Sequence, residues 1–455
     1  SINLHRIKQA NRKMDFKSDI GYRKETLKKL LYNIQKSEDL IVKALYDDFK
    51  KPEFEAVLTE TNYVISELKD VIKNINKWAK PERVFPSLLN FPSSDYLYKE
   101  PYGEVLIIAP WNYPFQLALC PLVAAVAAGN RVVLKPSELT PHTSAIIAKI
   151  IEKTFHVNHV EVFEGGVEVS NKLLAQRWDY IFFTGSVTVG KIVAKAAAEN
   201  LTPVTLELGG KNPCIIDETA NLKLAAKRIV WGKFINAGQT CIAPDYILIQ
   251  KNMKVNFISY MIEEIIKAYG KKIDKSPDFA RIINTKNWYR LTNMIQNEHI
   301  LFGGESDANK LYIAPTLLEE PDLDSPIMKE EIFGPILPIL IYENENDIEK
   351  VVSRYEKPLS FYIFSENNSF VQKLISKYSF GGGCINDTVI HFSNNRLPFG
   401  GVGHSGIGSY HGKRSFDTFS HHKPIVKKGN WLDLPLRYAP YKDKLASIKR
   451  ILDWL

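Results

Sequence analysis

At 455 residues, the chain exceeds the roughly 250–300 residues that a single hydrophobic core usually serves, so at least two domains are expected. The net charge of +8 arises from 59 basic and 51 acidic residues, which are interspersed along most of the sequence. Because nucleic-acid-binding proteins gather their basic residues into patches or recognition modules, we expect no nucleic-acid partner. The longest apolar run, residues 117–129, is shorter than the ~20 residues that span a bilayer and contains Pro121, which predicts a buried helix.

The four cysteines are scattered and form no C-x-x-C pair, which is typical of a protein from a reducing compartment. No group of cysteines and histidines has the spacing of metal ligands, so no metal site is expected. The first six residues contain no apolar segment of the secretory type, and we expect a cytoplasmic protein. Three of the cysteines lie in apolar or glycine-rich segments and are predicted to be packing residues, namely Cys120, Cys214 and Cys384.

The predicted elements begin with a helical region at residues 18–80, where apolar residues recur three and four positions apart before Pro81. Short β-like runs then alternate with helices, at residues 105–109, 131–134, 160–163, 180–183 and 204–206. A second alternating series has its apolar runs at residues 214–216, 246–249, 336–341 and 359–364. Strands that alternate with helices predict parallel sheets covered on both faces, so the predicted fold class is α/β with two such domains.

Two glycine-rich segments resemble nucleotide-binding loops. Residues 185–191 fit the spacing G-x-x-x-x-G-K, but Ile192 stands where a nucleotide triphosphatase needs a serine or threonine hydroxyl for magnesium. The helix start at this point is still expected to bind a phosphate group, because free backbone amides and the helix dipole favour an anion. Residues 401–406 fit G-x-G-x-x-G, but no predicted strand leads into them, and we predict a loop there.

Cys241 is the candidate nucleophile, because it lies among small, polar and turn-forming residues at positions 236–246. An unperturbed thiol with a pKa of about 8.5 is only slightly ionised near neutrality, so a catalytic cysteine needs a base or hydrogen-bond donors nearby. Three polar residues in glycine- or proline-containing segments are the candidates for these roles: Glu207, Asn112 and Glu331. Together these residues suggest covalent chemistry on a carbonyl group.

Seven motifs in the same order resemble those of the aldehyde dehydrogenase superfamily, and they cover nearly the whole chain. They are PWNYPF (110–115), KPSE (135–138), FTGS (183–186), LELGGK (206–211), GQTC (238–241), EIFGP (331–335) and PFGG (398–401). Within the superfamily the chain is similar to the class 3 branch, on residues 241–246, 386–387, 391, 409–413, 415–419 and 437–441. One departure is Ala439, where that branch usually has proline.

The resemblance implies the roles of the candidate residues. Cys241 would attack the aldehyde carbon, while the Asn112 amide and the Cys241 backbone N–H hold the oxyanion. After hydride leaves for the nicotinamide, Glu207 would activate the water that hydrolyses the thioester. Glu331 would bind the nicotinamide ribose and Phe333 would pack beside the ring. The sequence leaves open whether Glu207 or Glu331 is the main base.

The expected cofactor is NAD, with NADP as an alternative. Glu138 can accept hydrogen bonds from both adenine-ribose hydroxyl groups, which favours NAD, whereas Lys135 could meet the 2′-phosphate of NADP. The helix that starts after residue 184 would take the pyrophosphate, through Gly185, Ser186 and Gly190.

The resemblance also implies the domain organisation and a homodimer. The Rossmann-like cofactor domain would comprise residues 1–80 and 101–207, and the catalytic α/β domain residues 208–391. A small β extension for oligomerisation would comprise residues 81–100 and 392–424, since unpaired edge strands favour pairing with a second subunit. Residues 425–455 would form a C-terminal tail.

The tail contains an amphipathic helical pattern, formed by Leu445, Ile448, Ile451 or Leu452, and Leu455. Such a helix would pack on the protein's own surface or on the partner subunit, or it would contact an anionic membrane. A tail helix near the substrate entrance would form an apolar lid, and Tyr113 and Trp231 are candidates for the lining of an apolar tunnel. Together these features suggest medium to long aliphatic or aromatic aldehydes as substrates.

Two other functions compete with aldehyde oxidation. The first is a hydrolase or acyltransferase that uses the same thiol without redox chemistry and would need no nicotinamide site. The second is a non-catalytic relative, which is disfavoured because Cys241, Glu207 and Asn112 are all present.

Overall fold

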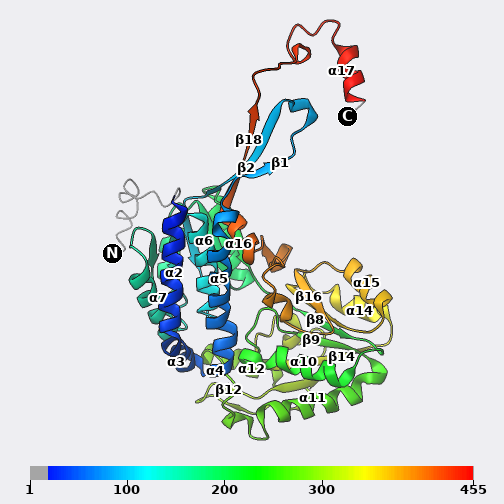
Figure 1. The fold of residues 1–455 in the computed structure, drawn as a ribbon. Helices are drawn as coiled ribbons and strands as arrows, with labels where there is room; N and C mark the ends of the chain where they lie inside the picture. Colours follow the sequence, from blue (N-terminus) through cyan, green and yellow to red (C-terminus); the bar gives the residue numbers. More distant parts are fainter. Residues whose placement is uncertain (1–18, 454–455) are drawn as a thin grey trace.

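The computed structural model describes residues 19–453 (Figure 1). Its N-terminal part is a layer of helices, as predicted from the apolar spacing. The elements are α2 (Ile20–Lys36), α3 (Glu38–Phe49), α4 (Glu53–Ala56), the π-helical turn η2 (Val57–Thr61) and α5 (Asn62–Trp78). Asp19 caps α2 by accepting a hydrogen bond from the Tyr22 backbone N–H at 2.8 Å. The apolar face of α2 is fully buried through Leu27, Leu30 and Ile34.

The first large sheet has the strand order β17-β7-β6-β3-β4-β5. Its strands are β3 (Glu104–Ile108), β4 (Arg131–Lys135), β5 (Val160–Val162), β6 (Tyr180–Thr184), β7 (Val204–Glu207) and β17 (Gly406–Ile407). The connecting helices are α6 (Gln116–Ala128), α7 (Pro141–Thr154), α8 (Val167–Leu174) and α9 (Val187–Ala198). Strands β3 to β7 pair in parallel, and every residue of β4, β6 and α6 is buried. The predicted parallel sheet is therefore confirmed.

The strand order of this sheet reverses between β3 and β6. From β3 the chain builds outward through β4 and β5, and it then returns to β6 and β7 on the other side. In open parallel sheets, ligands bind outside the carboxyl ends of the strands at such a reversal. The two loops that start there carry Asn112 and Gly185.

The second large sheet has the strand order β10-β13-β14-β9-β8-β15-β16. Its strands are β8 (Pro213–Ile216), β9 (Tyr246–Gln250), β10 (Ile300–Phe302), β13 (Thr316–Glu319), β14 (Ile336–Tyr342), β15 (Ser360–Phe364) and β16 (Gly382–Ile385). The helices of this domain are α10 (Leu222–Phe234), α11 (Lys254–Tyr269), α12 (Thr285–Ile295), α13 (Pro326–Lys329), α14 (Glu345–Val352) and α15 (Asn368–Lys377). Strands β8, β9, β14 and β15 match the predicted runs, which confirms the α/β fold class.

The two large sheets contribute opposite edges to the same region. Asn112, Gly185 and Glu207 lie at the carboxyl ends of β3, β6 and β7, whereas Cys241 and Glu331 precede the amino ends of β9 and β14. A hydrogen bond from Asn112 Nδ2 to the Gln239 backbone O, 3.2 Å long, joins the two edges.

The β extension consists of β1 (Glu82–Val84), β2 (Ser93–Pro101) and β18 (Ser420–Lys428), all antiparallel, and Figure 1 shows it projecting from the body. It differs from the expected segment 392–424, because β18 pairs with β2 along its whole length and runs on to Lys428. The residues before β18 belong to the body. The helix α16 (Gly412–Thr418) packs against α5 and α6, and β17 pairs with β7.

The C-terminal helix α17 (Leu445–Leu452) lies beyond the β extension and away from both large sheets (Figure 1). Packing of the tail on the body of its own subunit, one of the expected placements, is therefore not found for the described residues. Leu445 is 65% exposed and Leu452 is 51% exposed. The side chain of Ile451 and the whole of Leu455, which belong to the expected apolar stripe, lie outside the described residues. Within residues 19–453, no helix has the length and apolar character needed to cross a bilayer.

We predict that Gly129→Ala destabilises the protein. Gly129 ends α6 with a left-handed backbone at φ 96° and ψ 18°, which costs a residue with a side chain about 1–2 kcal/mol. A Cβ atom there would also lie 2.7 Å from Arg23 Cζ, and the guanidinium of Arg23 donates to the Ala127 carbonyl at 3.1 Å. Urea unfolding followed by circular dichroism should show a lower midpoint.

The matched control for this prediction is Gly166→Ala, because Gly166 precedes α8 at φ −85° with no atom within 4 Å of the added Cβ. Because Gly166 is the N-cap residue of α8, where glycine is favoured over alanine, its unfolding midpoint should decrease only slightly and less than that of Gly129→Ala. Equal midpoints for the wild type and Gly129→Ala would contradict the packing argument.

Candidate active site

The backbone before Cys241 is held in an unusual conformation. Asn236 and Ala237 both have left-handed backbones, at φ 54° and 52°, and such strain in a residue with a side chain costs on the order of 1–3 kcal/mol. Gly238 follows at φ 74°, and a Cβ atom on it would lie only 2.3 Å from the Gly334 carbonyl O. This tight turn presses the Cys241 loop against the loop that carries Glu331.

Side-chain amides fix the Cys241 loop from both sides. Asn212 Nδ2 donates to the Cys241 carbonyl at 2.8 Å and to the Ala243 carbonyl at 3.0 Å. Gln239 Nε2 donates to the Asn236 carbonyl at 3.1 Å, and its Oε1 accepts from the Ile283 N–H at 3.0 Å. Because these amides are buried, the thiol occupies a defined position.

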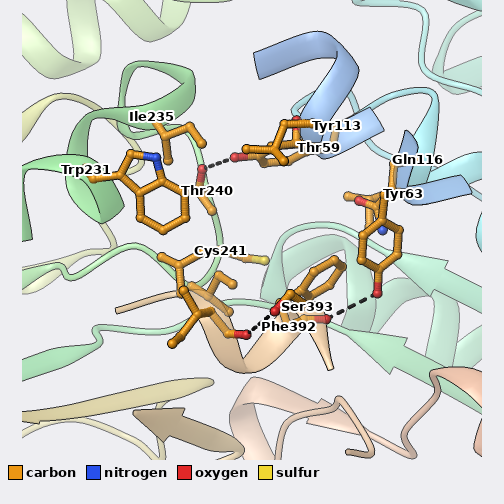
Figure 2. Close-up of a pocket in the computed structure, with 15 residues that line it drawn as sticks. Thr59, Tyr63, Tyr113, Gln116, Trp231, Ile235, Thr240, Cys241, Phe392 and Ser393 are labelled. Atoms are coloured by element: carbon orange, nitrogen blue, oxygen red, sulfur yellow. Dashed lines mark hydrogen bonds between the residues drawn. The ribbon is translucent and has the colours of Figure 1, made fainter. Parts of the chain in front are cut away.

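An apolar cavity of about 190 Å³ opens on one side of Cys241 (Figure 2). Tyr113 and Trp231, the two expected tunnel residues, both line it, and Tyr113 donates to or accepts from Thr240 Oγ1 at 2.8 Å. The other lining residues come from η2, α5, α6, the segment between α10 and β9, and the segment after β16. They are Leu58, Thr59, Tyr63, Gln116, Leu117, Ile235, Thr240, Ile242, Val389, Ile390, Phe392 and Ser393. Nothing in their local sequence pattern pointed to a shared cavity.

A second, more polar cavity of about 440 Å³ also includes Cys241 in its wall. Six of the residues expected in the active or cofactor site line it, namely Asn112, Gly185, Ser186, Glu207, Glu331 and Phe333. Trp111, Asn287, Arg290 and Glu330 line it as well and were not anticipated. Asn287 and Arg290 lie on the amphipathic helix α12, where polar residues ordinarily face solvent, so their local pattern carries no signal for a site.

Three residues expected in the cofactor site are absent from the described wall of this polar cavity, namely Lys135, Glu138 and Gly190. Lys135 Nζ forms an ion pair with Glu138 Oε2 at 3.1 Å, at the end of β4 beside β3. Gly190 instead packs α9 against Leu208, because a Cβ there would lie 2.6 Å from Leu208 Cδ2. Lys135 and Glu138 therefore lie together at the carboxyl edge of the first sheet, and Gly190 has a packing role.

The two carboxyl groups beside Cys241 both have raised pKa values. Glu207 is 2% exposed, and neither of its carboxylate oxygens has a hydrogen-bond partner among the described residues. Burial raises its pKa well above the usual value for glutamate. Burial, followed by the nearby charge of Asp245, raises the pKa of Glu331 to about 8. Burial thus favours the neutral form of Glu207, and Glu331 is largely protonated near neutrality.

The thiol of Cys241 is itself hard to ionise in this arrangement. Burial raises its pKa to about 12, and the negative charges of Glu331 and Glu207 act in the same direction. Hydrogen bonds from the backbone N–H groups of Cys241 and Ile242 act in the opposite direction. These amides are donors close to the sulfur, where an anion formed on an attacked carbonyl would also need them.

Asn112 completes this donor group. The Asn112 side chain is buried, and its Nδ2 donates to the Gln239 backbone carbonyl at 3.2 Å. The Asn112 backbone carbonyl accepts from Asn236 Nδ2 at 2.8 Å. An amide nitrogen carries two N–H groups, so one remains for a ligand in the polar cavity. The residues can thus hold an oxyanion next to a thiol.

A buried ion pair below the site joins its two loops. Lys211 Nζ contacts Asp245 Oδ2 at 2.7 Å and donates to the Ile327 and Glu330 carbonyls at 2.8 Å. Asp245 Oδ1 accepts from the Ile332 N–H at 3.0 Å. This network fixes Glu331 relative to the strand that follows Cys241, and sequence reasoning did not identify it.

The residues of the polar cavity fit a nicotinamide dinucleotide. The N-terminus of α9, with Ser186 as its cap, supplies amides for a pyrophosphate, and Arg290 adds a positive charge. Glu331 supplies a carboxylate for ribose hydroxyls, and Phe333 supplies an aromatic surface 5.4 Å from the ring centroid of Trp111. Among residues 19–453, no group of histidine, cysteine and acidic side chains could hold a metal ion.

Comparisons with known proteins agree with this arrangement. The aldehyde dehydrogenase family matches residues 5–425. The 4,4′-diaponeurosporen-aldehyde dehydrogenase of Staphylococcus aureus is 50% identical over 433 residues, which are 95% of this chain and 94% of that protein. Aldehyde dehydrogenase family 3 member A2 of Pongo abelii is 45% identical over 410 residues, covering 90% of this chain and 84% of that protein.

Solved structures show the same relationship. The substrate-bound state of Staphylococcus aureus AldH has a TM-score of 0.96 at 48% identity and covers 99% of this chain and 98% of that one. Mycobacterium tuberculosis aldehyde dehydrogenase complexed with NAD+ has a TM-score of 0.84 at 25% identity, over 94% of this chain and 90% of that one. The chain therefore belongs to the aldehyde dehydrogenase family, and it is an enzyme that oxidises aldehydes with a nicotinamide cofactor.

Proposed function

We propose that this enzyme oxidises apolar aldehydes through a thiohemiacetal and then a thioester on Cys241. The observation that carries the proposal is the position of Cys241 in the walls of both cavities. An aldehyde whose hydrocarbon part lies in the apolar cavity presents its carbonyl carbon to the sulfur. A hydrolase or acyltransferase using the same thiol would have no use for the polar cavity, which favours redox chemistry.

In the first half-reaction, the bond from Cys241 Sγ to the carbonyl carbon forms as the thiol proton passes to the carboxylate form of Glu207, which releases this proton to solvent before hydrolysis. The Asn112 amide and the Cys241 N–H then stabilise the negative charge on the former carbonyl oxygen, which preorganised donors do at no reorganisation cost. The nicotinamide ring supplies the acceptor for the hydride that leaves this carbon. A thioester remains on Cys241.

In the second half-reaction, water attacks the thioester and the carboxylic acid is released. We assign the general base to Glu207, because its carboxyl group is buried and unpartnered among the described residues of the polar cavity, and because burial raises its pKa and so makes the carboxylate a stronger base. We assign Glu331 to the nicotinamide ribose, because Lys211 and its backbone contacts hold the Glu331 loop in place.

The apolar cavity supports medium to long aliphatic or aromatic aldehydes as substrates. Its wall is formed almost entirely by hydrocarbon and aromatic groups, and removal of such a substrate from water contributes about 25 cal/mol per Å² of apolar surface. The similar Staphylococcus aureus protein is named for the 4,4′-diaponeurosporen aldehyde. We propose a substrate of the same apolar character here.

We propose a cytoplasmic homodimer, with the β extension as the element that pairs with the partner subunit. The strand β1 leaves one edge of the extension unpaired within this chain, and Phe85 beside it is 92% exposed. Because α17 lies away from its own body, we propose that it contacts the partner subunit, with an anionic membrane as the alternative. Sedimentation equilibrium tests the dimer, and flotation with anionic liposomes tests the membrane.

The first prediction tests the nucleophile. Cys241→Ser should abolish the oxidation of hexanal or dodecanal with NAD, because an alcohol is a far weaker nucleophile than a thiol and burial disfavours the charged form of both flanking carboxyl groups. Reduced-cofactor absorbance measures this loss. The control is Cys384→Ser, at a half-buried cysteine on β16, which should keep its turnover. Turnover retained by Cys241→Ser would remove the central proposal.

The second prediction tests the base. Glu207→Gln should slow hydrolysis of the thioester more than hydride transfer, so a pre-steady-state burst of reduced cofactor should appear or grow. Because burial raises the pKa of Glu207, the wild-type hydrolysis rate should increase with pH as this group loses its proton. The variant should lose that increase. If Glu331→Gln removes the pH dependence and Glu207→Gln does not, the two assignments must be exchanged.

The third prediction concerns cofactor preference. Glu138→Gln should lower kcat/KM for NAD relative to NADP, because it removes an acceptor for ribose hydroxyls and leaves the charge of Lys135 free to meet a 2′-phosphate. Steady-state kinetics with both cofactors measure the ratio. Glu152→Gln, an exposed substitution on α7, serves as the control. An unchanged ratio in Glu138→Gln would reject the assignment.

A further inference from the structure

A fully buried ion pair lies behind the active site, and no step of the proposed reaction uses it. Lys51 Nζ and Glu60 Oε1 are 2.9 Å apart, and both side chains are 0% exposed. Neither residue belongs to the walls of the two cavities as the described residues form them. Because desolvation of two charges offsets most of their attraction, a buried ion pair is weak evidence for stability alone.

Glu60 connects the helical layer to the loop that carries Asn112. It lies on the π-helical turn η2, a local structure that is frequent at functional sites, and its neighbours Leu58 and Thr59 line the apolar cavity. Its second oxygen, Oε2, accepts hydrogen bonds from the backbone N–H groups of Phe115 at 3.0 Å and Gln116 at 2.8 Å. These amides lie at the start of α6, where a negative charge is favourable.

Lys51 reaches the same loop from the other side. Its Nζ lies 3.9 Å from the ring centroid of Tyr113, the residue after Asn112, which is a close cation–π contact. The Tyr113 hydroxyl is hydrogen-bonded to Thr240 Oγ1 at 2.8 Å, a contact that Figure 2 shows next to Cys241. The ion pair thus holds the loop at residues 113, 115 and 116, immediately after the oxyanion donor.

We propose that Lys51 and Glu60 are positioning residues for the oxyanion donor, and that their ion pair holds the loop so that the Asn112 amide faces the carbon bound to Cys241. This inference rests on the proposed oxyanion role of Asn112. The charge-assisted bonds from Glu60 resist movement of the start of α6, and the contact of Lys51 with Tyr113 resists rotation of the loop. A displacement of about 1 Å in such a donor can lower a rate by roughly 10²-fold.

A double-mutant cycle tests this inference. The variant Lys51→Met/Glu60→Gln removes both charges of the pair together, so neither partner is left unpaired; the buried Glu55, whose charged form Lys51 also favours, is left to take up a proton. Its pre-steady-state rate of hydride transfer is compared with those of Asn112→Ala and of the triple variant, all at saturating NAD and hexanal. The rate of Cys241 alkylation by iodoacetamide is measured in parallel, because the reaction of the thiol with iodoacetamide forms no oxyanion.

We expect the double variant to lose roughly 10-fold to 10²-fold in hydride transfer, with unchanged alkylation of Cys241 and unchanged affinity for NAD. Asn112→Ala alone should lose about 10²–10³-fold. In the Asn112→Ala background, removal of the ion pair should have little further effect, because the donor that it positions is gone. Lys51→Arg, which keeps the charge, should restore most of the hydride-transfer rate relative to Lys51→Met.

The inference would be overturned if the rate losses of the double variant and of Asn112→Ala multiply independently in the triple variant. It would also be overturned if Cys241 alkylation in the double variant decreases as much as hydride transfer. If Asn112→Ala itself keeps its rate, the proposed oxyanion role fails, whatever the ion pair does. The matched control is Arg131→Met, which removes a buried cation from an ion pair with Glu104 at the amino edge of the first sheet, far along the strand from Asn112. Its rates per folded molecule should equal those of the wild type, and thermal unfolding of every variant gives the folded fraction.

Discussion

The desolvation of the Cys241 sulfur is the constraint on which the rest of the site depends. A partly exposed thiol with two glutamate side chains beside it is harder to ionise, because desolvation and each negative charge raise its pKa. Burial also raises the pKa values of Glu207 and Glu331, so the surroundings favour the neutral form of all three groups. Only one of them needs to carry a negative charge at each stage, which lets one small, dry space contain a nucleophile and a base.

This constraint explains why the site is assembled from opposite edges of two sheets. The carboxyl edge of the first sheet offers loops and a helix N-terminus, which suit an anionic cofactor, and it also carries Asn112 and Glu207. The amino edge of the second sheet offers the strained turn at Asn236 and Ala237, which fixes the thiol through backbone geometry. Neither edge alone brings a nucleophile, a base and an oxyanion donor together.

The sequence allowed prediction of the parts whose local pattern determines them. The parallel strands β3 to β9 follow from apolar runs that alternate with helices, and Cys241 stands out among small polar residues. The Lys51–Glu60 pair, Asn287 and Arg290 could not be predicted, because no local pattern marks them. Lys51 lies between α3 and α4 and the other three lie on helical segments, and each acquires its place only through packing between distant segments. β16 was missed because its glycines carry no side chains to show an alternating pattern. Gly190 appeared to belong to a phosphate loop, but contact with Leu208 accounts for it.

The separation of the two cavities also sets the direction from which water reaches the intermediate. Glu207 belongs to the wall of the polar cavity, whereas the described wall of the apolar cavity does not include it. A hydrocarbon chain in the apolar cavity closes that side to water, since its lining offers few groups that could hold an ordered water molecule. Under the proposed assignment of Glu207 as the base, the water would therefore reach the thioester from the side of the polar cavity.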